Sequence, residues 1–306
     1  MTPNGSAKPF RSGYVGLVGA PNVGKSTLLN QLLQEKISIT APKPQTTRNR
    51  IMGILTTEDF QVIFVDTPGI HRARDPFNKI LVDTALSTLS EVDVIYFLVE
   101  APDADREINA FILENLARVN TPVFLVINKI DLLPNKQALL PLMARFQSLH
   151  AFHAFIPISA LTGDGVQTLL DETIGLLPEG PRYYPEDYLT DQPERFLVAE
   201  LIREKVFHLL REEIPYAVAV VVDTFTEVPE RNRIDIEATI HVEKDSQKAI
   251  LIGKKGQMLK EIGKQARTDI EALLGSHVFL GLFVRVQKNW RKDMRMLSEF
   301  GYRSEG

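Results

Sequence analysis

The stretch of residues 19–26 constrains the fold of this chain more than any other. It reads Gly-Ala-Pro-Asn-Val-Gly-Lys-Ser and lies between an apolar run at 14–18 and a helical run at 27–33. The two glycines let the backbone curl so that its N–H groups point at phosphate oxygens, and the following helix adds its positive N-terminal dipole. Lys25 supplies a charge and Ser26 a hydroxyl ligand for Mg²⁺. A plain glycine turn is the weaker interpretation, because the flanking strand and helix are the context that phosphate binding requires.

The rest of the first half alternates short apolar runs with amphipathic stretches, the pattern of a mostly parallel sheet wound by helices. Six strands are expected, at 14–18, 51–57, 61–65, 94–99, 123–127 and 155–158. The pattern stops after Leu177, and the residues that follow are rich in Pro, Tyr and acids, which predicts a linker. We therefore expect a flexible N-terminus at 1–11, an α/β P-loop domain at 12–177, a linker at 178–194 and a smaller α+β domain at 195–306.

Residues 66–69, Asp-Thr-Pro-Gly, come about forty positions after the phosphate loop, at the end of an expected strand. A carboxylate there can orient Mg²⁺ through water, and the Gly69 N–H can meet the γ-phosphate. The polar stretch 36–50 lies between the two motifs, and one of its threonines can ligate Mg²⁺ and respond to the γ-phosphate. Thr47 is our first choice and Thr46 the second, with a plain mobile loop as the alternative. The predicted metal ligands are Ser26, Thr47 and Asp66.

Two further motifs select the base. Asp131, in Asn128-Lys129-Ile130-Asp131, can accept from the N1–H and the exocyclic amine of guanine, whereas adenine would leave it unpaired, which disfavours an ATP-using enzyme. Ser159-Ala160-Leu161 follows another strand, so the Ala160 N–H can donate to guanine O6. All these motifs fall at the carboxyl ends of strands, where open α/β sheets bind ligands. The predicted GTP site comprises Gly19, Ala20, Pro21, Asn22, Val23, Gly24, Lys25, Ser26, Thr27, Asp66, Thr67, Pro68, Gly69, Ile70, Asn128, Lys129, Ile130, Asp131, Ser159, Ala160 and Leu161.

The last third of the chain predicts a nucleic-acid-binding domain. The expected order is a helix at 195–210, an antiparallel strand pair at 216–225 and 233–242, a helix at 248–252, the turn Gly253-Lys254-Lys255-Gly256, a helix at 257–274 and a strand at 277–286. Residues 244–295 hold 12 Lys and Arg against 5 Asp and Glu, although the whole chain has a net charge of −4. A G-x-x-G turn lets the backbone approach phosphates closely while a neighbouring groove holds unstacked bases. An ordinary helix end and a solvated charged face are the alternatives.

These motifs together resemble the translation-factor-related GTPases, and their union with a C-terminal KH domain of type II resembles the Era family of bacterial GTPases. The resemblance covers about 12–297. It implies a GTP/GDP switch that acts on the small (30S) ribosomal subunit, in its assembly and in 16S rRNA 3′-end maturation, with the single-stranded 3′ region of that RNA as ligand. Trp290, with Arg291, Lys292 and Arg295, is expected to contact RNA rather than merely to cap the domain. The candidate RNA-binding residues are Ile252, Gly253, Lys254, Lys255, Gly256, Lys260, Arg285 and Lys288.

One position departs from Ras-like switches. Ile70 follows Gly69 where a glutamine would orient the attacking water, and an isoleucine cannot do so. Backbone groups, another residue, a partner or a monovalent cation must then take this role. Similar GTPases that lack the glutamine use a phosphate-loop asparagine to help coordinate K⁺, so Asn22 predicts potassium-stimulated turnover, with simple support of the loop as an equal alternative. Lys25, Thr47, Gly69 and Asn22 are the candidate catalytic residues, and intrinsic hydrolysis is expected to be slow.

Composition limits the remaining options. The chain has no cysteine, which excludes disulfides and thiolate chemistry, and the pair His150 and His153 reads as a helix end rather than a metal site. We find neither a signal peptide nor a membrane-spanning stretch, so a cytoplasmic location is expected, with peripheral contact with the membrane left open. A monomer is a separate expectation, because the sequence does not indicate the oligomeric state. Two rival interpretations stay open: a membrane-associated signalling GTPase whose basic block binds anionic lipid of the inner membrane, and a scaffold that holds GTP without hydrolysing it.

Overall fold

The first domain is built on a six-stranded sheet. The computed structural model describes residues 9–73, 75–104 and 107–302, so most of the expected flexible N-terminus lies outside the described residues. All neighbouring strands are parallel except β2 and β3, which are antiparallel. The six predicted strands are confirmed. In sheet order they are β2 (Ile51–Thr56), β3 (Phe60–Asp66), β1 (Arg11–Gly19), β4 (Val94–Glu100), β5 (Val123–Asn128) and β6 (Ala154–Pro157).

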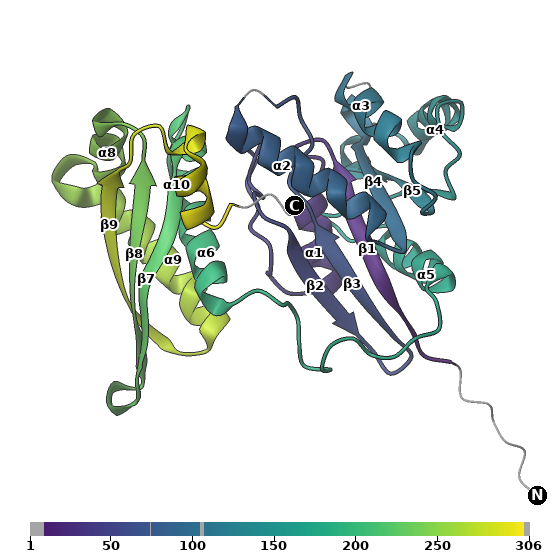
Figure 1. Ribbon diagram of the computed structural model, residues 1–306. Helices are drawn as coiled ribbons and strands as arrows, with labels where there is room; N and C mark the ends of the chain where they lie inside the picture. Colours follow the sequence, from purple (N-terminus) through teal and green to yellow (C-terminus); the bar gives the residue numbers. More distant parts are fainter. Residues whose placement is uncertain (1–8, 74, 105–106, 303–306) are drawn as a thin grey trace, which may run out of the picture.

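Helices cover both faces of this sheet (Figure 1). Buried residues of α1 (Lys25–Leu33) and α5 (Val166–Leu176) belong to one apolar core. Those of α3 (Glu107–Leu116) and α4 (Leu139–Gln147) lie in a second core on the opposite face, together with Ala85 of α2 (Pro76–Ser87). Phe77, Ile80 and Leu81 of α2 belong instead to a cluster shared with the second domain. This double covering explains why the strands read as nearly continuous apolar runs rather than as alternating ones. His150 and His153 lie between α4 and β6, and no cluster of metal-binding side chains occurs in the part of the chain that the structure describes.

The linker 178–194 lies along the β2 edge of the first sheet. The Ile54 N–H donates to the Leu189 carbonyl at 2.8 Å, and the Thr190 hydroxyl donates to the Met52 carbonyl at 2.6 Å. Further along, the Gln61 side-chain amide donates to the Tyr184 carbonyl at 2.9 Å. An edge strand exposes unpaired backbone groups, and the linker satisfies some of them here. The linker is therefore fixed to the first domain over most of its length.

The second domain has a three-stranded sheet with helices on one face. β7 (Ala219–Val228) pairs antiparallel with β8 (Arg233–Val242), and β9 (His277–Val286) pairs parallel with β8. α6 (Glu194–Leu209) and α9 (Gln257–Leu274) share an apolar core with the inward side chains of the strands. α8 (Asp245–Ile252) and the 3₁₀ turn Lys254–Gly256 precede α9. These elements follow the order of a type II KH domain.

The expected strand at 216–225 was placed too early. Residues Ile214–Ala217 form a short helix, α7, and the strand begins at Ala219. Pro215 occupies the start of this helix, where its fixed φ is favourable and its missing N–H has no partner to lose. The apolar residues at 216–218 therefore belong to a helical turn and its exit.

The position of Trp290 contradicts a second expectation, that this side chain contacts RNA. Its side chain is fully buried, and its Nε1–H donates to the Ala217 carbonyl at 3.0 Å. The ring packs edge-on against Phe77 of α2 and Phe300, and stacks on Tyr302. Trp290 thus holds the C-terminal helix α10 (Met294–Glu299) and joins the two domains rather than contacting RNA. Across the described residues, no helix is both long and apolar enough to cross a membrane.

Candidate nucleotide and RNA sites

The phosphate loop leaves β1 and enters α1 as expected. Gly24 has φ +99°, and a Cβ there would lie 2.1 Å from the Asn128 side-chain nitrogen, so only glycine fits. Lys25 is buried, and its Nζ donates to the carbonyl oxygens of Gly19 and Ala20 at 3.3 and 3.0 Å. Burial lowers the pKa of Lys25 to about 8, although Asp66 acts in the opposite direction. The loop therefore concentrates positive charge where phosphates would bind.

The three predicted metal ligands lie together. The hydroxyls of Ser26 and Thr47 are 2.8 Å apart, and Ser26 donates to Asp66 Oδ2 at 2.6 Å. Thr47 lies 3.4 Å from the same oxygen, whereas the Thr46 hydroxyl donates to the Lys43 carbonyl instead. This arrangement favours Thr47, our first choice, over Thr46.

Asp66 shows that the set fits a hard cation. Its side chain is fully buried, Oδ2 accepts from three hydroxyls, and Oδ1 has no hydrogen-bond partner. Burial raises the pKa of this carboxyl, with Lys25 opposing the shift. A buried, unpaired carboxylate oxygen beside two hydroxyls is an oxygen-only environment of the kind that Mg²⁺ prefers. Ser26, Thr47 and Asp66 would hold it, directly or through water.

Asn128 connects the guanine motif to the phosphate loop. Its side-chain nitrogen donates to the Val23 carbonyl at 2.7 Å, and its oxygen accepts from the Ala160 N–H at 2.9 Å. The Ala160 N–H, which we expected to donate to guanine O6, therefore donates to the Asn128 side chain in this structure. Asp131 is exposed, lies in the 3₁₀ turn Ile130–Leu132 that follows β5, and lines the pocket. Lys129 has φ +64° and pairs with Glu100, the last residue of β4.

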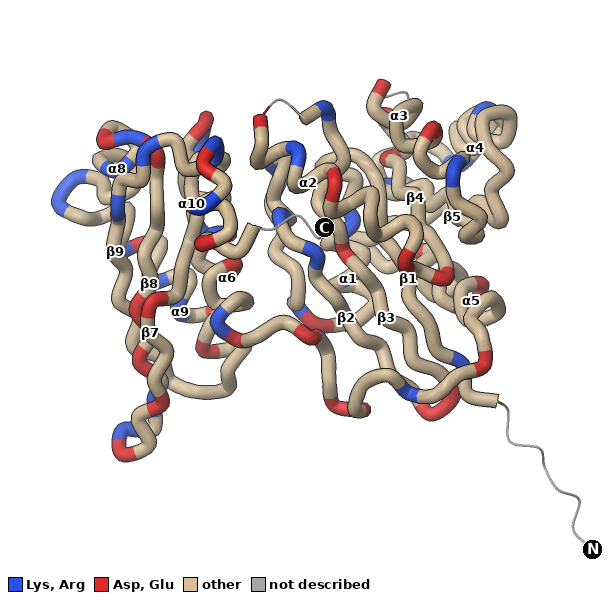
Figure 2. The backbone as a smooth tube through the Cα atoms, viewed as in Figure 1, with Lys and Arg blue, Asp and Glu red and all other residues tan. Residues whose placement is uncertain are grey.

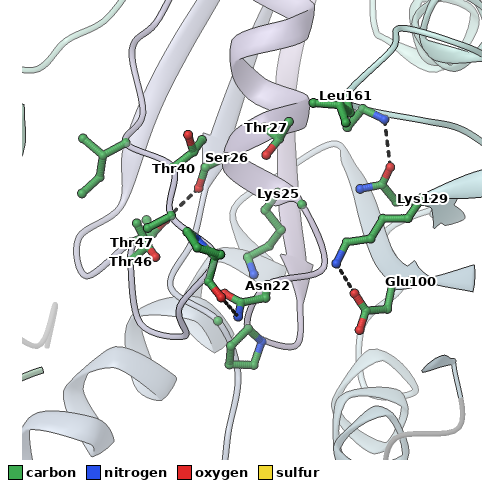
Figure 3. A pocket seen from close by; sticks show the side chains of 18 of the residues that line it. Asn22, Lys25, Ser26, Thr27, Thr40, Thr46, Thr47, Glu100, Lys129 and Leu161 are labelled. Atoms are coloured by element: carbon green, nitrogen blue, oxygen red, sulfur yellow. Dashed lines mark hydrogen bonds and ion pairs between the residues drawn. The ribbon is translucent and has the colours of Figure 1, made fainter. Parts of the chain in front are cut away.

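One pocket of about 630 Å³ unites these groups (Figure 3). It brings together the phosphate loop, the 36–50 stretch, Gly69, the guanine motif and the 159–161 motif. Thr67 and Ser159 are buried behind it: Thr67 donates to the Leu17 carbonyl, and the Ser159 N–H donates to the Asp164 carbonyl. The predicted residues that line the pocket are Pro21, Asn22, Gly24, Lys25, Ser26, Thr27, Thr47, Gly69, Asn128, Lys129, Asp131, Ala160 and Leu161.

Sequence reasoning missed several residues of this site, among them Ser38, Glu100 and His208. Ser38 is fully buried and donates to Asp66 Oδ2 at 2.8 Å. Glu100 lines the pocket, and its position at a strand end was an available signal. His208 also lines the pocket but comes from α6, and its Nε2 lies 3.0 Å from the Thr40 carbonyl oxygen. Nothing in the sequence links residues so far apart.

The Ile70 side chain cannot take part in the reaction. It is fully buried in the core below the sheet, and its N–H donates to the Gly19 carbonyl at 3.0 Å. The next residue, His71, is directed to Gly69 and Asn78: its Nδ1 lies 2.9 Å from the Gly69 carbonyl oxygen, and its Nε2 lies 2.8 Å from Asn78 Oδ1. In this structure the His71 side chain therefore bonds within the protein, to Gly69 and Asn78.

The 36–50 stretch, which we call the switch segment, is attached to the second domain by charge. Lys36 pairs with Glu204 of α6 at 2.7 Å and with Asp269 of α9 at 3.0 Å, and the Thr40 N–H donates to Glu204 at 3.0 Å. Burial raises the pKa of the Glu204 carboxyl, but the Lys36 and Thr40 hydrogen bonds outweigh it, so the net shift is downward. Glu204 is therefore held as a carboxylate at this contact.

Two buried arginines extend the attachment. Arg48 is 2% exposed and donates to the carbonyl oxygens of Val218, Pro215 and Tyr216 at 2.5, 3.0 and 3.2 Å. Arg203 of α6 is 1% exposed, pairs with Glu200 and donates to the Thr46 carbonyl. Residues on either side of Thr47 are thus bonded to the second domain while Thr47 itself bonds to the metal-ligand set.

The G-x-x-G turn lies at the far end of the second domain, where Lys and Arg gather (Figure 2). Gly253 has φ +72°, and a Cβ there would lie 2.7 Å from the Met258 Cβ. Lys254 and Lys255 are exposed, and Lys260 lines a neighbouring groove of about 550 Å³ between α9 and β9. Leu280 and Leu282 form its apolar side, and Lys264 and Arg267 add charge. This is the combination that a single-stranded nucleic acid requires.

Three other predicted RNA-binding residues do not line this groove. Ile252 is half-buried at the end of α8, and Lys288 is exposed just after β9. Arg285, however, pairs in register with His241 on the sheet face opposite to the groove. Successive residues of a strand point to opposite faces, so Arg285 and the groove residue Leu282 cannot share one.

Comparisons with known proteins agree with this geometry. Residues 14–129 match the model of the family described as 50S ribosome-binding GTPase, and residues 213–291 match the KH domain model. The chain is 57% identical over 293 residues to GTPase Era of Syntrophus aciditrophicus, covering 96% of this chain and 95% of the relative. It is also 57% identical over 295 residues to GTPase Era of Geotalea uraniireducens, covering 96% and 99%.

Two solved structures are similar over nearly their whole length. One is a variant of Aquifex aeolicus Era bound to GDP and AlF₄⁻, and the other is Era in complex with MgGDPNP and nucleotides 1506–1542 of 16S ribosomal RNA. Each has a TM-score of 0.93 and 42% sequence identity, and covers 96% of this chain and 99% of the solved one.

Proposed function

The chain belongs to the Era family of GTPases and hydrolyses GTP, and from this premise we propose that it is a switch acting on the small ribosomal subunit. Its KH domain would bind the single-stranded 3′ region of the 16S rRNA during subunit assembly and 3′-end maturation. The observation that carries this proposal is the groove between α9 and β9, with its exposed lysines and apolar floor beside the G-x-x-G turn. The RNA bound to the Era structure described above supports the choice of ligand.

The nucleotide site supports a hydrolysis that depends on positioning and charge. Water attacks the γ-phosphorus and GDP leaves, so little covalent chemistry falls to the protein. Mg²⁺, when bound by Ser26, Thr47 and Asp66, neutralises phosphate charge. Lys25 adds a second positive charge, and the Gly69 N–H can bond to the γ-phosphate. These groups stabilise the negative charge that develops on the phosphates in the transition state. The side chain at position 70 does not orient the water.

We propose that K⁺ contributes at the phosphates through Asn22. The side-chain nitrogen of Asn22 donates to the Pro42 carbonyl of the switch segment at 3.2 Å, so its oxygen stays directed away from that bond. Turnover measured at constant ionic strength in KCl and in NaCl tests this. We expect faster hydrolysis in KCl, and loss of that difference in Asn22→Ala. Equal rates in both salts would leave Asn22 as a support of the loop.

Nucleotide state would reach the RNA site through the switch segment rather than through the linker. The linker is bonded to the first domain, whereas the switch segment contacts both the metal ligands and α6. A change at Thr47 would therefore move the second domain. Equal RNA affinity with GDP and with a non-hydrolysable GTP analogue would rule this coupling out.

RNA binding is tested by fluorescence anisotropy with a labelled oligonucleotide from within nucleotides 1506–1542 and a scrambled one. We expect the native sequence to be preferred, and the preference to be lost in Gly253→Asp and in the double variant Lys254→Glu, Lys255→Glu. Arg118→Glu, an exposed charge change in the first domain, is the matched control. If neither turn variant weakens binding, the RNA site lies elsewhere.

We further propose a monomer in the cytoplasm. The rival interpretation is that the basic turn binds anionic lipid. The same variants distinguish lipid binding from RNA binding. Co-sedimentation with vesicles containing anionic lipid, weakened by Lys254→Glu, Lys255→Glu while RNA preference stays intact, would favour the membrane.

A further inference from the structure

The nucleotide pocket takes one of its lining residues from the second domain. Among the described residues that line the pocket, His208 is the only one beyond position 161. It is exposed and lies in the last turn of α6. Its Nε2 lies 3.0 Å from the Thr40 carbonyl oxygen. A carbonyl oxygen only accepts hydrogen bonds, so Nε2 carries the hydrogen and donates it. The second domain thus bonds directly to a residue that lines the nucleotide pocket.

Thr40 is bonded to α6 through both of its backbone polar groups. Its N–H donates to Glu204 Oε1 at 3.0 Å, and its carbonyl oxygen accepts from His208. Glu204 and His208 are four positions apart, so they project from the same face of the helix, one turn apart. Two successive turns of α6 therefore hold one backbone unit of the switch segment.

The neighbours of Thr40 are attached to the second domain as well. Ile39 is 2% exposed and packs in the apolar core of the second domain, although it also lines the nucleotide pocket. The Lys43 ammonium donates to the carbonyl oxygens of Phe207 and Leu210 at the C-terminal end of α6. Carbonyl groups at a helix end lack partners within the helix, so a lysine there satisfies them.

Residues 39–42, which we call the pocket wall, all line the nucleotide pocket. In Figure 3, Thr40 lies on the side of the pocket away from Lys129 and Glu100. The first domain holds the two ends of the wall: the Ser38 N–H donates to an α1 side chain, Asn30 Oδ1, at 2.9 Å, and Asn22 Nδ2 donates to the Pro42 carbonyl at 3.2 Å. The middle of the wall is held by α6 instead. Both domains therefore have to stay in place for the wall to keep its position.

We propose that His208 is a positioning residue of the nucleotide site. By holding the Thr40 carbonyl it keeps the pocket wall over the bound nucleotide, so the second domain controls how fast the nucleotide leaves. The three predicted metal ligands lie outside the wall, and the wall therefore acts on GDP and GTP alike. This separates it from the coupling through Thr47, which depends on the γ-phosphate. The inference does not depend on the RNA proposed above.

The test measures nucleotide release from the full-length protein. Fluorescent methylanthraniloyl derivatives of GDP and of a non-hydrolysable GTP analogue are displaced by excess unlabelled GDP and followed by stopped flow. We expect His208→Ala to release both nucleotides about fivefold faster, because one hydrogen bond to the wall is lost. His208→Gln, whose side-chain amide can donate to the same carbonyl, should stay within about twofold of the wild type. His277→Ala, the same substitution at an exposed histidine of β9, is the matched control and should leave both rates unchanged.

The other outcomes overturn the proposal. Unchanged release in His208→Ala would do so, as would an equal acceleration in His277→Ala. If His208→Gln releases nucleotide as fast as His208→Ala, the hydrogen bond to Thr40 is not the cause. If only the GTP analogue leaves faster, His208 acts through the γ-phosphate and not through the wall. Urea denaturation accompanies each variant, and a lower midpoint in His208→Ala than in His277→Ala would assign His208 a merely structural role.

Discussion

Arg48 and Val218 are joined by a hydrogen bond of 2.5 Å between Nη1 and the carbonyl oxygen, across 170 positions of the chain. Arg48 follows Thr47 directly, and Thr47 bonds to Ser26 at the metal-ligand set. Two adjacent residues therefore carry the contact with the metal-ligand set and the contact that holds the second domain.

Replacing this arginine should uncouple the two domains. Arg48→Met keeps the apolar stem between Phe77 and Phe207 but removes the hydrogen bonds to α7 and Val218. We expect GTP affinity to stay within about threefold, while the difference in RNA affinity between GDP and a GTP analogue disappears. Anisotropy titrations in both nucleotide states measure this. Arg50→Gln, whose ion pair with Glu91 lies within the first domain, is the control, and a retained difference in Arg48→Met would contradict the coupling.

Removing the charge of Asp66 should weaken magnesium binding. Asp66→Asn keeps the shape of the side chain but weakens a hard-cation site. We expect GTP turnover to fall about 100-fold and the magnesium concentration for half-maximal rate to rise. A phosphate-release assay over a magnesium titration checks both. Unchanged magnesium dependence would place the metal elsewhere.

Asp131 should decide which base binds. In Asp131→Asn the side chain offers an amide donor, which matches the C2 carbonyl of xanthine and opposes the guanine amine. We expect GDP affinity to fall about 100-fold and XDP to bind more tightly than GDP. Competition against a fluorescent nucleotide provides the measurement, and an unchanged order of affinity would remove Asp131 from the base site.

We expect Trp290 to contribute to the stability of the fold and not to RNA binding. Trp290→Ala leaves a cavity between α2, β7 and α10, and should lower the free energy of unfolding by about 3–5 kcal/mol. Trp290→Phe fills most of the space, and its RNA affinity should equal that of the wild type. Urea denaturation and anisotropy test the two statements. Weakened RNA binding in a stably folded Trp290→Phe would restore a contact role.

His241 should make stability depend on pH. Burial lowers the pKa of this ring, Arg285 lowers it further and Asp223 opposes them. The folded state therefore binds a proton less readily than the unfolded state, so stability is complete above pH 6.5 and declines as the pH falls below it. The loss stays below the limit of about 1.4 kcal/mol per pH unit set by one proton. Denaturation of wild type and His241→Phe at pH 7 and 5 tests this: the variant should lose less stability, and an equal loss would exclude His241.

Local chemistry made much of this protein predictable. The strands of the first sheet are buried on both faces, so their apolar runs identify them without knowledge of their neighbours. The phosphate loop, the Asp66 motif and the Asn128 motif each carry their chemistry within a few residues, and each follows a strand whose carboxyl end fixes its place. The turn at Gly253 was found in the same way.

The sequence determined which groups the protein brings to its nucleotide, and the tertiary structure decided what holds those groups in place. Arg48, His208 and Trp290 acquire their roles from residues far away in the chain: a carbonyl at 218, a carbonyl at 40 and a ring at 77. Such contacts depend on how two domains pack, and a polar or aromatic side chain carries no mark of its distant partner. Arg285 shows the same limit within one strand, because the face to which it points is fixed by the register with β8 and by the helices on the other side.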